Sequence, residues 1–274
     1  MSDRYAVMGN PIHHSKSPQI HSEFAKQTQQ DLIYSAMLVP IDSFESVAKD
    51  FFQNNGKGLN ITVPFKEQAF QMADELTLRA QTAQAVNTLM LQADGSVLGD
   101  NTDGAGLVGD LITNHQVVLK DKRILVIGAG GAVRGILQPF LNEQPSSITV
   151  VNRTVEKAKV LASSFSEFGN ISACEFNQLD EAFDVIINGT SASLSGELPP
   201  LPDCVVGTHT AVYDMMYGKE PTTFLKWAQN LGASKTLDGL GMLVGQAAVS
   251  FMLWRKQQPD SQKVLLDMRK QLQE

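Results

Sequence analysis

The sequence has little cysteine, no excess of positive charge and no long apolar stretch, and each shortage excludes a class of protein. Its two cysteines, Cys174 and Cys204, form no CxxC pair, so we expect buried free thiols and neither a disulfide nor a metal site. The net charge of −7 argues against a nucleic-acid partner, because phosphate binding requires an excess of lysine and arginine. No apolar run approaches the roughly 20 residues that cross a bilayer, and no secretory signal is visible. We therefore expect a cytoplasmic enzyme or binding protein without a membrane partner.

The first hundred residues alternate strand-like and helix-like patterns, which is typical of an α/β domain with a mostly parallel sheet. Ser17 is expected to cap the first helix, with Pro18 as its first residue. Asp94-Gly95 is expected to be the turn of a hairpin. The predicted strands are 5–9, 33–39, 58–63, 87–91 and 97–99, and the predicted helices are 17–29, 43–53 and one that begins at Pro64.

A second α/β region follows, beginning with a helix near 104–111. It contains continuous apolar segments, which are typical of strands covered on both faces. We expect a Rossmann-type domain at 104–240 and a substrate-binding domain at 1–103 and 241–274, with the C-terminal helices returning to the first domain. The predicted strands of the second region are 123–127, 147–151, 184–188 and 211–214, and the last stretch, 241–273, is strongly helical.

A glycine-rich segment follows the first strand of this second region and opens a helix. Glycines permit the tight turn there and let backbone N–H groups approach a pyrophosphate, while the helix N-terminus adds positive potential. The alternative interpretation is an ordinary turn that favours small residues. The segment predicts a dinucleotide site at Gly128, Ala129, Gly130, Gly131 and Ala132.

The end of the next strand indicates which dinucleotide binds. NAD sites usually place Asp or Glu there to bond the ribose 2′-hydroxyl, whereas this chain has Asn152, Arg153 and Thr154. Arg153 can pair with a 2′-phosphate and stack on the adenine, and Asn152 and Thr154 can donate hydrogen bonds. Lys157, one helical turn later, adds positive charge. We therefore predict NADP as the cofactor; the alternative is that Arg153 is only a solvated surface residue.

Lys66 and Asp103 are the candidates for acid–base chemistry. If Pro64 opens a helix, Lys66 lies in its first turn, where a cation meets the positive end of the helix dipole. We interpret this unfavourable position as a sign of function; the alternative is an exposed lysine that tolerates a few tenths of a kcal/mol of repulsion. Asp103 either caps the helix that follows it or pairs with Lys66.

Three further polar residues precede helices or strands. Ser15 and Ser17 are two hydroxyls just before a helix, which suits a small anion such as a carboxylate; the alternative is that Ser17 serves only as a cap. Asn87 is either a site residue or an ordinary turn amide. His13 and His14 have no suitably spaced partner, so we predict no metal site.

Taken together, these segments resemble the shikimate dehydrogenase family. They follow the family's order and cover nearly the whole chain. The matching segments are Ser15-Lys16-Ser17-Pro18, Asn60-Ile61-Thr62-Val63-Pro64-Phe65-Lys66, Ala85-Val86-Asn87-Thr88, Gly99-Asp100-Asn101-Thr102-Asp103-Gly104, Gly128-Ala129-Gly130-Gly131-Ala132, Asn152-Arg153-Thr154, Asn188-Gly189-Thr190-Ser191, Tyr213-Asp214-Met215-Met216-Tyr217 and Asp238-Gly239-Leu240-Gly241-Met242-Leu243-Val244-Gly245-Gln246.

The resemblance implies reversible, NADPH-dependent reduction of 3-dehydroshikimate to shikimate, a step toward chorismate and the aromatic amino acids. It implies that small molecules are the partners and that Lys66 and Asp103 flank the reacting oxygen. The implied substrate-binding residues are Ser15, Ser17, Thr62, Lys66, Asn87, Asp103, Tyr217 and Gln246, with the two serines on the substrate carboxylate. Beyond the glycine-rich loop and Arg153, the implied cofactor contacts are Thr190, Met215 and Gly239.

The sequence also departs from the family pattern and leaves alternatives open. Val133-Arg134-Gly135 stands where the family often has Ala-Arg-Ala, and Leu78 where many members have an acid. A related enzyme that accepts quinate, with NADP or NAD, is one alternative, and a non-catalytic NADP-binding regulator is another. The presence of both Lys66 and Asp103 favours the enzyme. The sequence is compatible with a monomer or a homodimer.

Overall fold

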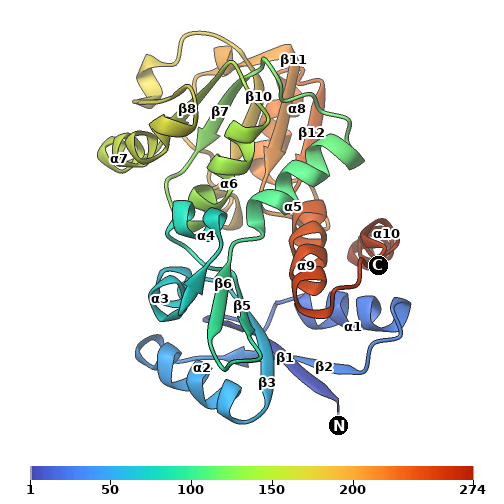
Figure 1. Cartoon of the computed structure of the whole chain (residues 1–274). Coiled ribbons are helices and arrows are strands. Elements are labelled where there is room, and N and C mark those ends of the chain that lie inside the picture. Colours follow the sequence, from blue (N-terminus) through green and yellow to red (C-terminus); the bar gives the residue numbers. More distant parts are fainter. Residues whose placement is uncertain (1, 274) are drawn as a thin grey trace. The chain divides into compact units, whose positions relative to one another are not determined.

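The computed structural model describes residues 2–273 and divides into two compact units. The first unit comprises Met1–Gly106 and Val244–Met268, and the second comprises Leu107–Leu243 and Arg269–Glu274. Each unit is built around its own six-stranded sheet (Figure 1).

The sheet of the first unit has the strand order β2-β1-β3-β5-β6-β4. Only β5 runs against its neighbours, because β5 pairs antiparallel with both β3 and β6 while the other pairs are parallel. The expected hairpin is thus confirmed, as β5 and β6. The strands are β1 (Asp3–Gly9), β2 (Leu32–Leu38), β3 (Gly56–Ile61), β4 (Glu75–Leu76), β5 (Thr88–Leu91) and β6 (Val97–Asp100), and the helices before the second unit are α1 (Ser17–Gln27), α2 (Phe44–Gln53), α3 (Lys66–Met72), α4 (Leu78–Ala83) and α5 (Asp103–Gly109).

Alternation along β1 explains why this sheet is covered on both faces. Ala6 and Met8 pack into a cluster with apolar side chains of α2 and α3, whereas Tyr5 and Val7 belong to a separate cluster with Tyr34. Successive side chains of a strand point to opposite faces, so the apolar run from Tyr5 to Met8 requires two cores.

The sheet of the second unit is entirely parallel, with the order β12-β11-β10-β7-β8-β9. Counted along this unit, that is the order of dinucleotide-binding sheets, so the expected Rossmann-type α/β class is confirmed. The strands are β7 (Arg123–Ile127), β8 (Ser147–Val151), β9 (Ile171–Cys174), β10 (Phe183–Asn188), β11 (Val206–Asp214) and β12 (Lys235–Asp238), and the helices that follow α5 are α6 (Gly131–Asn142), α7 (Val155–Phe165), α8 (Thr223–Asn230), α9 (Leu240–Arg255) and α10 (Ser261–Gln273).

The central strand β7 again divides its side chains between two cores. Ile124 and Val126 pack with apolar residues of α6 and α7, while Leu125 and Ile127 pack with residues of α8. All four side chains are fully buried. The continuous apolar pattern therefore reflects a parallel strand covered by helices on both faces.

Several local expectations were wrong. The N-cap of α1 is Lys16 without a side-chain cap, and Ser17 is instead the first helical residue. Pro64 precedes α3, which begins at Lys66. The strongly helical C-terminal stretch was predicted correctly and forms α9 and α10; the two helices are separated where Lys256 has a positive φ of 55° and Pro259 lacks the N–H that a continuing helix needs. The thiols are less buried than expected, since Cys174 is half-buried and Cys204 exposed.

A buried histidine lies in an aromatic cluster of the first unit. The ring of His21 stacks on Tyr34 with centroids 4.2 Å apart and also lies near Phe24, Phe251 and Trp254. Its Nε2 lies 3.1 Å from Asn60 Oδ1, whereas Nδ1 is the one buried side-chain polar atom of residues 2–273 without a partner. Burial lowers the pKa of His21 to about 3, although the hydrogen bond to Asn60 acts in the opposite direction.

This histidine should make stability depend on pH. Between the folded pKa of about 3 and the unfolded value of about 6.5, the unfolded chain binds a proton that the folded chain does not. The free energy of unfolding therefore falls as pH decreases through this window, by up to about 1.4 kcal/mol per pH unit. In the His21→Phe variant this contribution is absent. Urea unfolding of both proteins at about pH 7 and about pH 5 should show the wild type losing more stability; an equal loss would contradict the neutral buried imidazole.

Candidate functional site

The strand ends of the first unit bring its candidate residues to one edge of the sheet. Parallel strands β3 and β6 end there, and the antiparallel strand β5 begins there. Asn87, which immediately precedes β5, accepts a hydrogen bond from the Ile61 N–H at 2.7 Å and donates its own N–H to the Asp100 carbonyl at 3.0 Å. Asn87 is thus fixed between the end of β3, which leads to Lys66, and the end of β6, which leads to Asp103.

Lys66 and Asp103 form an ion pair at this edge. Lys66 Nζ lies 2.5 Å from Asp103 Oδ2, and the two side chains are only 16% and 7% exposed. Lys66 is the first residue of α3 and Asp103 the first residue of α5. A carboxylate is favoured at a helix N-terminus and an ammonium is disfavoured there, so Asp103 offsets the unfavourable position of Lys66. The predicted pairing of these two residues is present in the structure.

Asn87 holds the carboxylate of this pair from the other side. Its Nδ2 donates to Asp103 Oδ1 at 2.7 Å and lies 3.5 Å from Gln246 Oε1. Its Oδ1 accepts from the backbone N–H of Thr102 at 2.9 Å and from the Thr88 hydroxyl at 2.8 Å. Since a backbone N–H can only donate, the orientation of the Asn87 amide is fixed. Each oxygen of Asp103 consequently has its own donor, Asn87 for Oδ1 and Lys66 for Oδ2.

A second layer of buried polar groups lies beneath these residues. Asn60 Nδ2 donates to the Thr88 and Ser250 hydroxyls, each at 3.1 Å, and its Oδ1 accepts from the Tyr34 hydroxyl at 2.7 Å. Neither Asn60 nor Ser250 was assigned a role from the sequence. Their signal was present, because each is a polar residue inside an otherwise apolar segment, Leu59-Asn60-Ile61 and Ala248-Val249-Ser250-Phe251.

Arg79 and Asp100 fix the segment that leads to Asp103. Asp100 is 1% exposed and accepts from Arg79 Nε at 2.7 Å and from the Asn101 N–H at 2.8 Å. Burial alone would raise the pKa of Asp100, but the hydrogen bonds and charge of Arg79, with smaller contributions from Thr77 and Asn101, lower it. The carboxylate therefore stays ionised and anchors the turn between β6 and α5.

The two serines lie together at the start of α1. Ser15 Oγ accepts a hydrogen bond from the Ser17 N–H at 3.3 Å, and the buried Ser17 side chain is hydrogen-bonded to Tyr34. Thr62, just after β3, is half-buried. Among residues 2–273, no direct hydrogen bond links Ser15 or Ser17 to Lys66 or Asp103. The structure thus joins Lys66, Asp103, Asn87 and Gln246 in one cluster and the serines in another.

In the second unit the glycine-rich turn lies where the strand order reverses, between β7 and β10. Gly128 has a φ of +112°, and its N–H donates to the Val151 carbonyl at 2.8 Å. A Cβ at Gly128 would lie 3.2 Å from Thr190 Cγ2, so this turn is packed against the turn that follows β10. α6 then begins at Gly131 with Gly130 as its N-cap. A tight glycine turn leading to a helix N-terminus fits a pyrophosphate.

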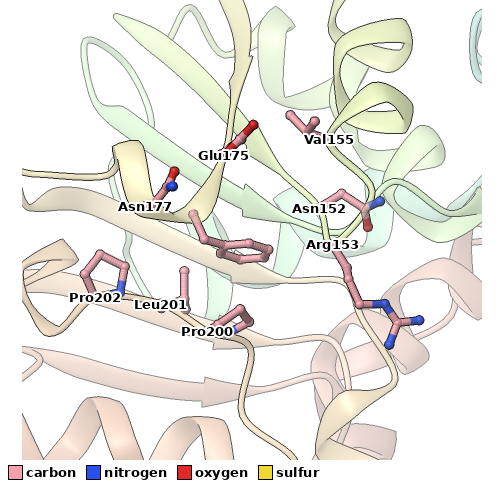
Figure 2. A pocket seen from close by; sticks show the side chains of 9 residues that line it. Asn152, Arg153, Val155, Glu175, Asn177, Pro200, Leu201 and Pro202 are labelled. Atoms are coloured by element: carbon pink, nitrogen blue, oxygen red, sulfur yellow. The ribbon is translucent and has the colours of Figure 1, made fainter.

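A pocket of about 820 Å³ adjoins the turn after β8. Figure 2 shows Asn152 and Arg153 at one end of it and Asn177 and Pro202 at the other. One carboxylate, Glu175, also lines the pocket, and its side chain accepts a hydrogen bond from the backbone of Gln178. Within the described part of the chain, Arg153 forms no ion pair with a carboxylate. Its exposed guanidinium is therefore available to an anion, and Lys157 one turn later is also exposed.

The remaining candidates of this unit lie at the ends of β10, β11 and β12. The Met215 N–H donates to the Asn188 carbonyl at 2.9 Å, and the Gly239 N–H donates to the Met216 carbonyl at 3.1 Å. Any side chain at Gly239 would overlap the backbone of Met215, so glycine is required for this close approach. Burial, with a smaller contribution from the charge of Asp238, raises the pKa of Tyr217.

From 2 to 273, no group of three or more His, Cys, Asp or Glu side chains is arranged to hold a metal ion. Over the same range, no helix has the length and apolar character needed to cross a bilayer.

Comparison with family models gives two matches along the chain. Residues 7–89 match the model described as the shikimate dehydrogenase substrate binding domain, and residues 110–195 match the shikimate / quinate 5-dehydrogenase model. The first match contains Lys66 and Asn87, and the second contains the glycine-rich turn and Arg153.

Individual relatives extend the similarity to nearly the full length. The chain is 56% identical to the shikimate dehydrogenase (NADP(+)) of Vibrio campbellii, over 99% of this chain and 98% of that protein. Among solved structures, an Ael1 enzyme from Pseudomonas putida has a TM-score of 0.92 and 43% identity, covering 99% of this chain and 98% of that one. Shikimate 5-dehydrogenase from Thermus thermophilus, in complex with NADP(H) and shikimate, has a TM-score of 0.86 and 31% identity, covering 98% and 99% of the two chains.

Two glycines of the turn after β7 should respond differently to a methyl group. Gly128→Ala should lower the free energy of unfolding by about 1–3 kcal/mol, because alanine is strained at a strongly positive φ. Gly130 has a φ of −87°, and a Cβ there would meet no other group within 4 Å, so Gly130→Ala should change stability by no more than about 0.5 kcal/mol. Urea unfolding of both variants measures this difference, and equal losses would show that the backbone at Gly128 is not strained by alanine.

Proposed function

The chain belongs to the shikimate dehydrogenase family, and on that premise we propose that it interconverts 3-dehydroshikimate and shikimate with NADP(H), a step of aromatic amino acid biosynthesis. The observation that carries the proposal is the partly buried Lys66–Asp103 pair, held by Asn87. A non-catalytic NADP-binding protein would not need a lysine held at a helix N-terminus, where its charge is disfavoured.

The proposed chemistry assigns one task to each member of the cluster. NADPH, when bound, supplies the hydride that adds to the carbonyl carbon of the substrate. Lys66, as the ammonium, stabilises the negative charge that develops on the carbonyl oxygen and donates the proton to it; in the reverse direction neutral Lys66 accepts the hydroxyl proton. Asp103 orients Lys66 and bonds the substrate hydroxyl. Asn87 holds Asp103, and Asn87 and Gln246 help to place the substrate ring.

The remaining substrate contacts are assigned by matching each side chain to a group of the substrate that it can bind. We assign the substrate carboxylate to the hydroxyls of Ser15 and Ser17, with the Ser17 hydroxyl oriented by Tyr34. Thr62 and Tyr217 are assigned to the hydroxyls of the ring.

For the cofactor, we assign the 2′-phosphate to Arg153 with Asn152, Thr154 and Lys157, and the pyrophosphate to the segment Gly128–Ala132. Thr190, Met215 and Gly239 are assigned to the nicotinamide side. The absence of a carboxylate at the end of β8 supports NADP over NAD, because an acid there would repel a 2′-phosphate.

We propose 104–240 as the cofactor domain and 1–103 with 241–274 as the substrate domain. A cytoplasmic location and a monomeric or homodimeric state stay predictions.

Replacing Lys66 tests the catalytic assignment. Lys66→Met should lower kcat by at least about 10²-fold with little change in the KM for shikimate, because the lysine acts on charge that develops in the transition state. Lys57→Met is the matched control, since Lys57 is an exposed lysine of β3. Steady-state oxidation of shikimate, followed by the absorbance of NADPH, measures both. Near-normal turnover of Lys66→Met would remove Lys66 from the catalytic role.

Reversing the charge of Arg153 tests the cofactor assignment. Arg153→Asp should raise the KM for NADPH far more than the KM for NADH, because only the former carries the 2′-phosphate. Lys120→Asp makes the same change in net charge at an exposed residue before β7, at the opposite end of that strand from Gly128. An unchanged ratio of the two KM values in Arg153→Asp would exclude Arg153 as the phosphate ligand.

A further inference from the structure

The second unit contains a buried carboxylate to which the proposed chemistry assigns no task. Asp214 is the last residue of β11 and is 0% exposed. Its Oδ1 accepts from Asn188 Nδ2 and from the Met216 N–H, each at 3.1 Å. Its Oδ2 accepts from the hydroxyls of Ser193 and Thr222, each at 2.6 Å. Four donors from two segments, one at and after the end of β10 and one after β11, thus converge on one side chain.

The four partners are all neutral, and among residues 2–273 no lysine, arginine or histidine pairs with Asp214. Burial raises the pKa of Asp214, and the hydrogen bonds from Ser193, Thr222, Met216 and Asn188 only partly oppose this effect. A buried carboxylate without a cation is costly to keep.

Two of the hydrogen bonds lead directly to proposed cofactor residues. Because Asp214 accepts from Asn188 Nδ2, the other end of that amide, Oδ1, is turned toward Thr190. Asn188 Oδ1 accepts there from the Thr190 N–H at 3.1 Å and from its hydroxyl at 2.7 Å. On the other side, the bond from the Met216 N–H fixes the segment that contains Met215. Removing the carboxylate would release both turns.

The position of these turns identifies the part of the ligand that they affect. In a doubly wound sheet the dinucleotide lies across the carboxyl ends of the strands, one half on each side of the point where the order reverses. Arg153, after β8, lies on one side of that point, while β10 and β11, which are neighbours in Figure 1, lie on the other. The turns held by Asp214 therefore lie on the side of the nicotinamide half of the cofactor, and not on the side of the adenosine half.

We propose that Asp214 is a positioning residue that holds the turns after β10 and β11 in register for the nicotinamide half of the cofactor. The proposal rests on the proposed function, because it takes NADP as the ligand. Asp214 itself is buried and acts through Thr190 and the Met215 segment.

The test separates the two halves of the cofactor by using two ligands. NADP⁺ spans both halves, whereas adenosine 2′,5′-bisphosphate occupies only the half assigned to Arg153. In Asp214→Ala the Kd for NADP⁺ should rise at least about tenfold, because four donors, among them the buried Asn188 amide, lose their acceptor, while the Kd for the bisphosphate should stay within about twofold. Isothermal titration of the purified full chain gives both constants.

Conservative variants supply the controls. Asp214→Asn should restore the Kd for NADP⁺ to within about threefold of the wild type, because the amide oxygen can still accept from Asn188 and Met216 while the two hydroxyls rotate to accept from its NH₂ group. If Asp214→Ala does not fold, Thr222→Val and Thr222→Ser carry the test. Thr222→Val, which loses one donor to Asp214, should weaken only NADP⁺ binding, and Thr222→Ser, which keeps the hydroxyl, should bind both ligands as the wild type does.

Each outcome decides the matter. Selective loss of NADP⁺ binding with rescue by Asp214→Asn supports the positioning role. Parallel loss of both ligands would overturn it in favour of a general role in folding, and unchanged binding of both would overturn it as well. Failure of the proposed function would give a different result. In that case the wild-type chain itself would bind neither NADP⁺ nor the bisphosphate, and there would be no NADP site for Asp214 to position.

Discussion

The direction of the strands is the constraint on which both sites depend. In the second unit all strands are parallel, so the turns that contain Gly128, Arg153, Thr190, Met215 and Gly239 all leave the same edge of the sheet. In the first unit the single antiparallel strand, β5, begins at the edge where β3 and β6 end. That reversal places Asn87 between the segments that lead to Lys66 and Asp103. Residues far apart in sequence are thereby assembled without long loops.

Buried amides and carboxylates then set the orientation of the groups at these edges. Asn87 has one correct orientation because the Thr102 N–H can only donate to it, and Asn188 has one because the Thr190 N–H can only donate to its Oδ1. Leaving a buried donor or acceptor unpaired costs about 1–3 kcal/mol, so each amide resists rotation. The same physical device thus fixes the Lys66–Asp103 pair in one unit and the turn at Thr190 in the other.

The sequence predicted what depends on local pattern and missed what depends on distant partners. Strands 123–127 and 147–151 were predicted at their observed bounds because both faces are buried, whereas β9 and β12, four-residue strands at the edges of their sheet, lack that pattern. Ser17 was assigned as a cap from its neighbour Pro18, yet its side chain bonds Tyr34 instead. Asn60 and Ser250 lie 190 positions apart, so only the fold reveals that they meet. The pairing of Lys66 with Asp103 was anticipated from chemistry and family resemblance.

The central claim is that this chain oxidises shikimate with NADP⁺. The most direct measurement is the initial rate of NAD(P)H formation by the purified wild-type chain, with shikimate or quinate as substrate and NADP⁺ or NAD⁺ as cofactor in all four combinations. We expect kcat/KM to be highest for shikimate with NADP⁺, and replacing NADP⁺ by NAD⁺ should lower it because Arg153 loses its phosphate partner. Absence of turnover in every combination, or a preference for quinate with NAD⁺, would contradict the claim.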